Sequence, residues 1–345
     1  MARRLAAGEA YSYWGGRPDA YVTPGFPLFL TLCMKIFGSD VYGLYWIKVV
    51  QGGLTALTVL LTFVLGKQLT KRYSAGLIAC ILVACNGAFP FLSRFLLTET
   101  LYYFTMMLFF VVFVYAWKKD TWWAHALAGA LFCVSVMVRP LLAIVSPFLY
   151  LPLLWHRRQC LKKVLWCAVA FAGAFCLVAL PWWIRNMVTL GRFVLFATQT
   201  NPIYAGLAPN VQALGLKDPG SFMGNIKLLF KLLWERPGGT LYWMTLGKFE
   251  IIFLRPIGVW IMKNLTTLAT HITLYLGLLG AGIVLLLPKA RWASVVFFVY
   301  LAASFAVVPS ARYGLQYMPF LAIFAGGLIT FLVEKIKESR AQALA

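Results

Sequence analysis

Long apolar stretches separated by short charged connections make up most of this chain of 345 residues. A helix needs about 20 apolar residues to cross the hydrocarbon core of a bilayer, and nine stretches approach that length. They are residues 43–66, 74–93, 96–117, 123–138, 140–156, 164–183, 268–288, 292–308 and 315–333. The pattern therefore predicts an all-α, polytopic membrane protein with about nine transmembrane helices.

Two further segments carry helical patterns without the length to span. Residues 221–235 bring apolar side chains such as Leu229 and Phe230 to one face, a pattern typical of a helix that lies in the membrane surface. Residues 27–37 predict a juxtamembrane helix that ends at Gly38. These patterns divide the chain into an outer juxtamembrane segment (1–42), a six-helix membrane region (43–183), a long outer loop with amphipathic helices (184–267), and a three-helix membrane region with a cytoplasmic tail (268–345).

Composition agrees with a chain that resides in lipid. Hydrophobic residues make up 62% of the sequence and aromatic residues 16%, which excludes an ordinary soluble enzyme. The formal net charge is +21, but the basic residues form short clusters between apolar segments. This distribution indicates membrane topology and excludes nucleic acid as the partner.

The basic residues also predict the orientation of the chain. One alternating set of short connections, with the C-terminal tail, is rich in them, and the positive-inside rule places this set in the cytoplasm. Residues 1–42 and 184–267 then lie outside. The short loops favour a bacterial cytoplasmic membrane, and an active site built from the outer segments would face outward. The rich set comprises Lys67, Lys71, Arg72, Lys118, Lys119, Arg157, Arg158, Lys162, Lys163, Lys289, Arg291, Lys335, Lys337 and Arg340, and the poor set Arg94, Arg139 and Arg312.

Metal and nucleotide motifs are absent from the sequence. The seven cysteines lack metal-ligand spacing, the three histidines are far apart, and neither an HExxH nor a GxxxxGK[ST] pattern occurs. We therefore expect no metal-ligating residues and no nucleotide or redox cofactor. The sequence leaves open whether a divalent cation takes part.

Short motifs rich in proline, glycine and aromatic residues stand where the predicted spans meet the outer surface. They are ARRLAAGEAY (2–11), PGFPLFL (24–30), LLTETLYYF (96–104), the Arg139-Pro140 step, LPWWIRN (180–186) and ARYGLQYMPF (311–320). In this order and spacing the constellation resembles the GT-C glycosyltransferases of the family 39 type, which includes protein mannosyltransferases and bacterial aminoarabinose transferases.

The resemblance implies a fold of roughly a dozen membrane helices with juxtamembrane helices on the outer face. It also implies transfer of a hexose or pentose from a polyprenyl-phosphate donor to a glycan, lipid or protein acceptor on that side of the bilayer. Two alternatives stay open: a flippase or transporter of lipid-linked sugars, and an inactive relative that only binds them.

Such a transfer needs a carboxylate to take the acceptor's proton and cations to hold the leaving phosphate. We predict catalytic roles for Glu99 and Asp19. The predicted substrate-binding residues are Arg139, Arg185, Asn186, Arg312, Tyr313, Pro24 and Gly25.

These residues also have simpler explanations. A carboxylate at Glu99 is favoured by the dipole of its helix, Arg139 suits an interfacial anchor, and Arg185 with Asn186 suits a boundary pair.

One departure from the family concerns the start of the chain. Relatives carry a first membrane helix and an acidic residue a few positions before the A-x-x-L-x-x-G-x-x-Y stretch, whereas here Met1 adjoins that stretch. We expect the chain as written to lack that helix and the main catalytic carboxylate, and to be weakly active or inactive unless Asp19 or Glu9 substitutes in part.

The predicted orientation can be tested by cysteine-accessibility labelling in a background without the native cysteines. Single cysteines in the 157–163 connection should react only with reagents that reach the cytoplasm, and cysteines near residue 217 only with reagents outside. Labelling of the 157–163 connection from outside would reverse the orientation.

Overall fold

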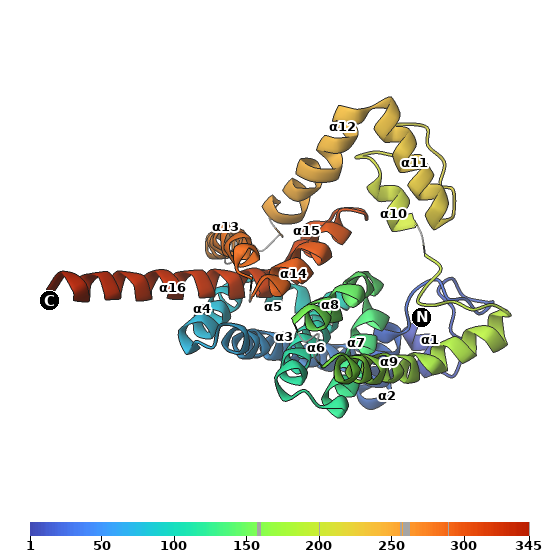
Figure 1. The fold of residues 1–345 in the computed structure, drawn as a ribbon. Coiled ribbons are helices and arrows are strands. Elements are labelled where there is room, and N and C mark those ends of the chain that lie inside the picture. The colour runs from blue at the N-terminus through green and yellow to red at the C-terminus, as the bar shows by residue number, and fades with distance from the viewer. Residues whose placement is uncertain (157–159, 200, 256, 258–262, 289, 345) are drawn as a thin grey trace.

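The computed structural model describes residues 1–156, 160–199, 201–255, 257, 263–288 and 290–344 (Figure 1). Arg157, Arg158 and Lys289 of the predicted cytoplasmic set lie outside these residues. The helices are α1 (Ala2–Ala6), α2 (Gly25–Phe37), α3 (Val41–Thr70), α4 (Tyr73–Ala84), α5 (Ala88–Ser93), α6 (Thr98–Lys119), α7 (Trp122–Val138), η1 (Pro140–Val145), α8 (Ser146–His156), α9 (Leu161–Leu190), α10 (Asn201–Gly206), α11 (Phe222–Glu235), α12 (Pro237–Tyr242), η3 (Trp243–Gly247), η4 (Glu250–Leu254), α13 (Lys263–Leu286), α14 (Arg291–Ser304), α15 (Ala311–Gly314), η5 (Leu315–Tyr317) and α16 (Met318–Leu344).

Helices cover all nine predicted spans, but not all to the predicted length. Within the described residues, five helical segments are long and apolar enough to cross a membrane: α3, α6, α9, α13, and the continuous α15–α16 segment. The other four predicted spans fall on shorter apolar helices, namely α4, α7, the η1–α8 segment and α14. The all-α, polytopic class is therefore confirmed.

Asn86 interrupts the predicted span 74–93. Its side-chain oxygen accepts a hydrogen bond from the backbone N–H of Ala88 (3.1 Å), and its amide donates to Thr270 Oγ1 of α13 (3.1 Å). A local side-chain bond of this kind competes with the helical pattern. The chain therefore leaves the helix after Ala84 and resumes as α5 at Ala88.

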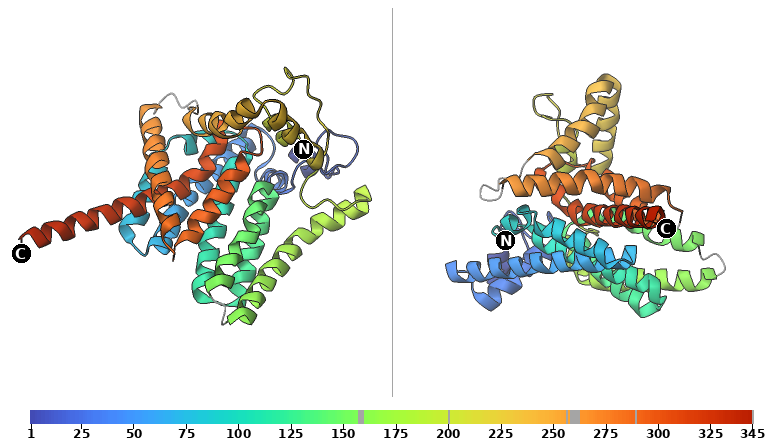
Figure 2. Two further views of the ribbon diagram at one scale, coloured as in Figure 1. Left: turned by 45° about the horizontal axis from the view of Figure 1, so that its top comes forward. Right: turned by 90° about the vertical axis from the view of Figure 1, so that its left-hand side faces the viewer.

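Close backbone approaches fix the bundle. α7 lies along α9 and α6, while α16 lies along α13 and α4 (Figures 1 and 2). A Cβ on Gly129 of α7 would lie 2.0 Å from the carbonyl oxygen of Phe171 in α9, and one on Gly326 of α16 would lie 2.3 Å from that of Ala75 in α4. Helices pack this closely only where one partner lacks a side chain.

The helix predicted over residues 27–37 is present as α2, which begins two residues earlier, and its juxtamembrane place stays a prediction. It ends at Gly38, whose φ of 90° lies in the region that favours glycine. Asp40 then caps α3 by accepting a hydrogen bond from the backbone N–H of Gly43 (2.9 Å). α2 therefore turns sharply into the first long helix.

Residues 201–254 form an arm of helices α10 to α12, η3 and η4 that projects from the bundle (Figures 1 and 2). The predicted amphipathic helix 221–235 is α11, and Leu229 packs with Leu232 in an apolar cluster of the arm itself. Phe230 is 67% exposed, whereas Leu229 faces the apolar partners that the arm itself supplies, including Leu207. The place of α11 in the membrane surface stays a prediction.

Lys248 attaches the arm to the bundle. Its side chain is fully buried and donates to the backbone carbonyls of Phe305 and Val307, which follow the last turn of α14. A cation at this position satisfies carbonyls that a helix end leaves without partners. Burial lowers the pKa of Lys248 from its ordinary value to about 8.

A side chain at Gly129 should separate α7 from α9. We expect Gly129→Val to lower the free energy of unfolding by about 1–3 kcal/mol, the usual cost of overpacking, and to reduce the thermal midpoint in detergent. Gly173→Val in α9 is the matched control, because nothing lies within 4 Å of a Cβ added there. Equal midpoints for the two variants would contradict the packing described here.

Candidate functional site

Glu99 lies in the first turn of α6 and is only 2% exposed. The chain enters this helix through the extended residue Leu97, whose carbonyl accepts a hydrogen bond from Gln51 Nε2 (3.2 Å). The side-chain hydroxyl of Thr98 donates to Glu99 Oε2 (3.2 Å). Because a buried carboxylate is costly unless it is paired, its remaining contacts define the site.

Arg139 forms the shorter of two ion pairs with Glu99. Its Nη2 atom lies 2.9 Å from Glu99 Oε1, and its Nε donates to Thr98 Oγ1 (3.0 Å). Arg139 ends α7 in an extended conformation (φ −141°, ψ 111°) because Pro140 follows it. The proline thus turns the arginine out of the helix toward α6.

Arg312 forms the second ion pair from the other end of the sequence. Its Nη1 lies 3.3 Å from the same Glu99 Oε1, and the hydroxyl of Tyr103 donates to its backbone carbonyl (3.0 Å). The ring of Tyr313 lies 5.0 Å from the guanidinium carbon of Arg139, within range of a cation–π contact. We call Thr98, Glu99, Arg139, Arg312 and Tyr313 the Glu99 site.

Pro24 and Gly25 lie at the start of α2, which packs against the end of α7 next to Arg139. Gly25 opens α2 where a Cβ would lie 2.6 Å from the carbonyl oxygen of Met137. The hydroxyl of Thr23 donates to the carbonyl of Val138 (3.2 Å). The structure therefore places the PGFPLFL motif against the end of α7, where it positions Arg139; substrate contact by Pro24 and Gly25 stays a prediction.

Asp19 belongs to a different cluster. Its carboxylate accepts hydrogen bonds from Ser12 Oγ (3.2 Å) and from the backbone N–H groups of Tyr13 (2.7 Å) and Tyr21 (3.0 Å). These bonds close the loop formed by residues 11–21. The described contacts of Asp19 thus stabilise this loop, and its catalytic role stays a prediction. Glu9, the other carboxylate considered for this role, is exposed.

Arg185 and Asn186 lie in the last turns of α9 and hold that same loop. Arg185 donates to the carbonyls of Asp19 (2.7 Å) and Tyr11 (2.8 Å) and to Asn186 Oδ1 (2.9 Å). Asn186, which is fully buried, donates weakly to the carbonyl of Val194 (3.4 Å). The two residues therefore fit the boundary pair considered from the sequence.

Three tyrosines missed by the sequence reasoning form the floor of the Glu99 site. The hydroxyls of Tyr102 and Tyr300 share a hydrogen bond, and the ring of Tyr102 lies 5.6 Å from the guanidinium carbon of Arg139. Tyr103 binds α15, as described above. A signal existed, since Tyr102 and Tyr103 follow Glu99 by three and four positions and thus share its helix face.

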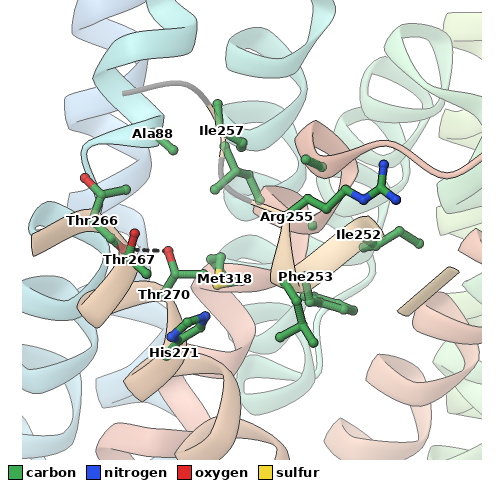
Figure 3. A pocket seen from close by; sticks show the side chains of 14 residues that line it. Ala88, Ile252, Phe253, Arg255, Ile257, Thr266, Thr267, Thr270, His271 and Met318 are labelled. Carbon is green, nitrogen blue, oxygen red and sulfur yellow. Dashed lines mark hydrogen bonds between the residues drawn. The ribbon is translucent and has the colours of Figure 1, made fainter. Parts of the chain in front are cut away.

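A cavity of about 160 Å³ adjoins α15, which contributes Arg312 to the Glu99 site and Gly314 to the cavity lining. Polar side chains in the lining include Arg255, Thr270 and His271 (Figure 3). α15 approaches η4 closely here, because a Cβ on Gly314 would lie 2.2 Å from the carbonyl oxygen of Ile252. The cavity and the ion pairs thus share one short helix.

One group of described residues could hold a metal ion. The ligand atoms of Asp120, His125 and Cys167 lie within 4.8 Å of one another, although the sequence spacing gave no sign of such a group. Lys163 Nζ already lies 2.9 Å from Asp120 Oδ2. Asp120 caps the far end of α6, so this group is roughly 30 Å along the helix from Glu99.

Removal of the Arg185 guanidinium should open the loop at residues 11–21. We expect Arg185→Met to accelerate amide hydrogen exchange in this segment about 30-fold, which corresponds to ~2 kcal/mol for the lost charge-assisted bonds. Arg192→Met, an exposed arginine in the turn after α9, is the control. Unchanged exchange in the Arg185 variant would show that other contacts hold the loop.

Comparisons with known proteins agree with the geometry. The model of the dolichyl-phosphate-mannose-protein mannosyltransferase family matches residues 21–183, somewhat less than half of the chain. This segment contains Glu99, Arg139 and the PGFPLFL motif. Among curated proteins, none matches the chain.

Solved structures of an archaeal enzyme share the fold. The oligosaccharyltransferase AglB from Archaeoglobus fulgidus, in complex with an inhibitory peptide and a dolichol-phosphate, matches with a TM-score of 0.54 at 15% identity, over 94% of this chain and 44% of that chain. A structure of the Archaeoglobus fulgidus oligosaccharyltransferase tethered to an acceptor peptide matches with a TM-score of 0.58 at 15% identity, over 93% and 42%.

This chain therefore spans less than half the length of these relatives, and identities this low show the fold alone. In its fold the chain is similar to these oligosaccharyltransferase structures, and the sequence of residues 21–183 is similar to the dolichyl-phosphate-mannose-protein mannosyltransferase family.

Proposed function

We propose that this chain is a glycosyltransferase that takes a sugar from a polyprenyl-phosphate donor at the Glu99 site. The observation that carries the proposal is the pairing of two arginines with one buried carboxylate. The pairing leaves the site one positive charge in excess. A phosphate monoester or diester would neutralise that excess.

The two guanidinium groups suit a phosphate by their geometry as well. Arginine presents a planar fork of donors that matches phosphate oxygens, and charge-assisted bonds of this kind are among the strongest in proteins. Arg312 has a 41% exposed side chain, whereas that of Arg139 is 18% exposed. Arg312 can thus reach an incoming donor while Arg139 holds its position on Glu99 and Thr98.

The chemistry follows from this arrangement. A hydroxyl oxygen of the acceptor forms a bond to the anomeric carbon of the sugar, and the bond from that carbon to the phosphate oxygen breaks, with its electron pair going to the phosphate. The arginines stabilise the charge that develops on the leaving phosphate. The acceptor's proton passes to a carboxylate.

Glu99 serves this reaction in two ways in our proposal. Its Oε1 atom holds both arginines side by side before the donor binds. When Arg312 turns to the phosphate, one lone pair of Glu99 is released toward the acceptor's proton. Among the described residues, Glu99 is the one carboxylate within ion-pair distance of both Arg139 and Arg312.

The remaining features of the proposal come from the sequence and the relatives. The site faces outward from a bacterial cytoplasmic membrane, as the distribution of basic loops favours. The sugar is a hexose or pentose, and the acceptor is a glycan, lipid or protein. The matched family's name and the peptides bound by the archaeal enzyme support a protein or peptide as the first acceptor to test.

Two substitutions should separate the roles of the site. Glu99→Gln keeps the side-chain size and removes the charge, so we expect transfer to fall at least about 100-fold with the fold intact. Arg312→Ala removes a phosphate-paired cation, so we expect this variant to lose donor affinity, by about 10-fold or more, as well as transfer activity. Donor-dependent transfer and donor binding in detergent measure the two effects.

Arg94→Ala is the matched control, because Arg94 is an exposed arginine in the connection between α5 and α6 and has no part in the Glu99 site. Its activity should equal that of the unaltered chain. Donor binding without transfer would identify an inactive lipid-sugar-binding relative, and transport in liposomes without transfer would identify a flippase. Either result would refute the proposal that this chain is a glycosyltransferase.

A further inference from the structure

A second, larger cavity lies at the end of the bundle opposite the Glu99 site. Its volume is about 690 Å³, within the usual range of ligand pockets, and it opens between α3, α4, α6, α13, α14 and α16. The C-terminal end of α6 borders it, whereas Glu99 lies at the N-terminal end of that helix. We call it the basic-end cavity.

Apolar side chains line most of the basic-end cavity. Val114 and Trp117 come from α6, Trp292 from α14, and Phe324 and Leu328 from α16. The rings of Trp117 and Trp292 pack with their centroids 4.5 Å apart. An acyl chain inside the cavity would contact apolar side chains from all three of these helices.

The helices around the basic-end cavity cannot move closer together. A Cβ on Gly66 of α3 would lie 3.1 Å from the Cα of Gly76 in α4, and one on Gly280 of α13 would lie 2.5 Å from the carbonyl oxygen of Phe324 in α16. The helices around the cavity already touch through their backbones. The space between them is therefore a fixed feature of the bundle.

Charged residues ring the mouth of the cavity. Lys71 and Arg72 follow α3, and Lys118 lies in the last turn of α6, while Glu334 of α16 pairs with Arg72 (3.1 Å). Lys118 donates to the backbone carbonyl of Gln68 (2.7 Å), which holds its ammonium at the rim. With three cations and one carboxylate, the rim carries a net charge of +2 and attracts an anion.

Gln68 adds a further binding group. Its side-chain oxygen is buried at the cavity and has no hydrogen-bond partner within the described part of the chain. A buried acceptor without a partner is costly, and a ligand with a donor group would relieve that cost. The cavity thus combines an apolar wall, a cationic rim and one unsatisfied acceptor.

We propose that the basic-end cavity binds an anionic phospholipid of the adjacent leaflet. The acyl chain lies against the tryptophan-lined wall, the phosphate lies between Lys71 and Lys118, and a headgroup hydroxyl donates to Gln68. The tail of a polyprenyl donor bound at the Glu99 site would be uncharged at this end and would gain nothing from the cationic rim. The proposal is independent of the proposed transferase.

Native mass spectrometry of the delipidated protein tests the proposal with phosphatidylglycerol and, as the zwitterionic comparison, phosphatidylcholine of the same chain length. Phosphatidylglycerol should bind at least about tenfold more tightly. Lys71→Gln combined with Lys118→Gln should lower its affinity about 25-fold, since each lysine near an anionic headgroup contributes about fivefold. Lys119→Gln, next to Lys118 but outside the cavity lining, should have no effect.

A second pair of variants tests the cavity itself. Gly327 lines it, and an added Cβ would meet only Thr70 Cγ2 at 3.4 Å, so Gly327→Phe should fill the space and abolish specific binding of phosphatidylglycerol. Gly282→Phe on α13, where nothing lies within 4 Å, is the matched control.

Equal affinity for the two lipids, or equal effects of the rim variants and Lys119→Gln, would overturn the proposal. Displacement of phosphatidylglycerol by a polyprenyl phosphate would overturn it as well, because the cavity would then belong to the donor. Transfer activity is not the readout, so a failed transferase proposal leaves this test intact.

Discussion

The ion pairs of Glu99 are the constraint on which the site end of the molecule depends. A carboxylate that is 2% exposed in an apolar bundle is tolerable only with opposite charges beside it. Those charges come from the end of α7 and from α15, segments far from Glu99 in the sequence. The bundle must therefore bring its first and last thirds together around one side chain. The same pairing leaves a surplus cation, which is the property a phosphate-binding site needs.

Backbone restrictions, more than side-chain packing, hold the arginines in place. Pro140 forces Arg139 into an extended conformation, and Gly25 lets α2 press against the last residues of α7. Gly314 allows α15 to approach η4 within a distance that any side chain would prevent. Lys248 fixes the arm through the carbonyls after α14, a few residues before α15. A substitution at any of these positions would act on the site through the placement of its arginines.

The two ends of the bundle differ in how their charges are satisfied. At the site end, Arg139 and Arg312 share one buried carboxylate. At the basic end, the cations are mostly exposed, and among the described residues of the cavity rim only Arg72 pairs with an acid. Buried charges demand partners of fixed geometry, whereas exposed ones are solvated and screened. The first arrangement suits one defined ligand group, and the second suits a mobile headgroup.

The sequence by itself determined the class of the fold, the positions of the helices, and the presence of unusual residues at their boundaries, because apolar runs and prolines act locally on the chain. It also singled out Glu99, Arg139 and Arg312, since isolated charges in apolar surroundings stand out. Only the tertiary structure decided that these three meet, that Asp19 and Arg185 hold the loop of residues 11–21, and that Asn86 interrupts a span through a bond to Thr270. The tyrosine floor and the Asp120, His125 and Cys167 group were likewise decided by the packing of distant helices. Such contacts depend on how helices cross, and hydropathy along the chain carries no record of that.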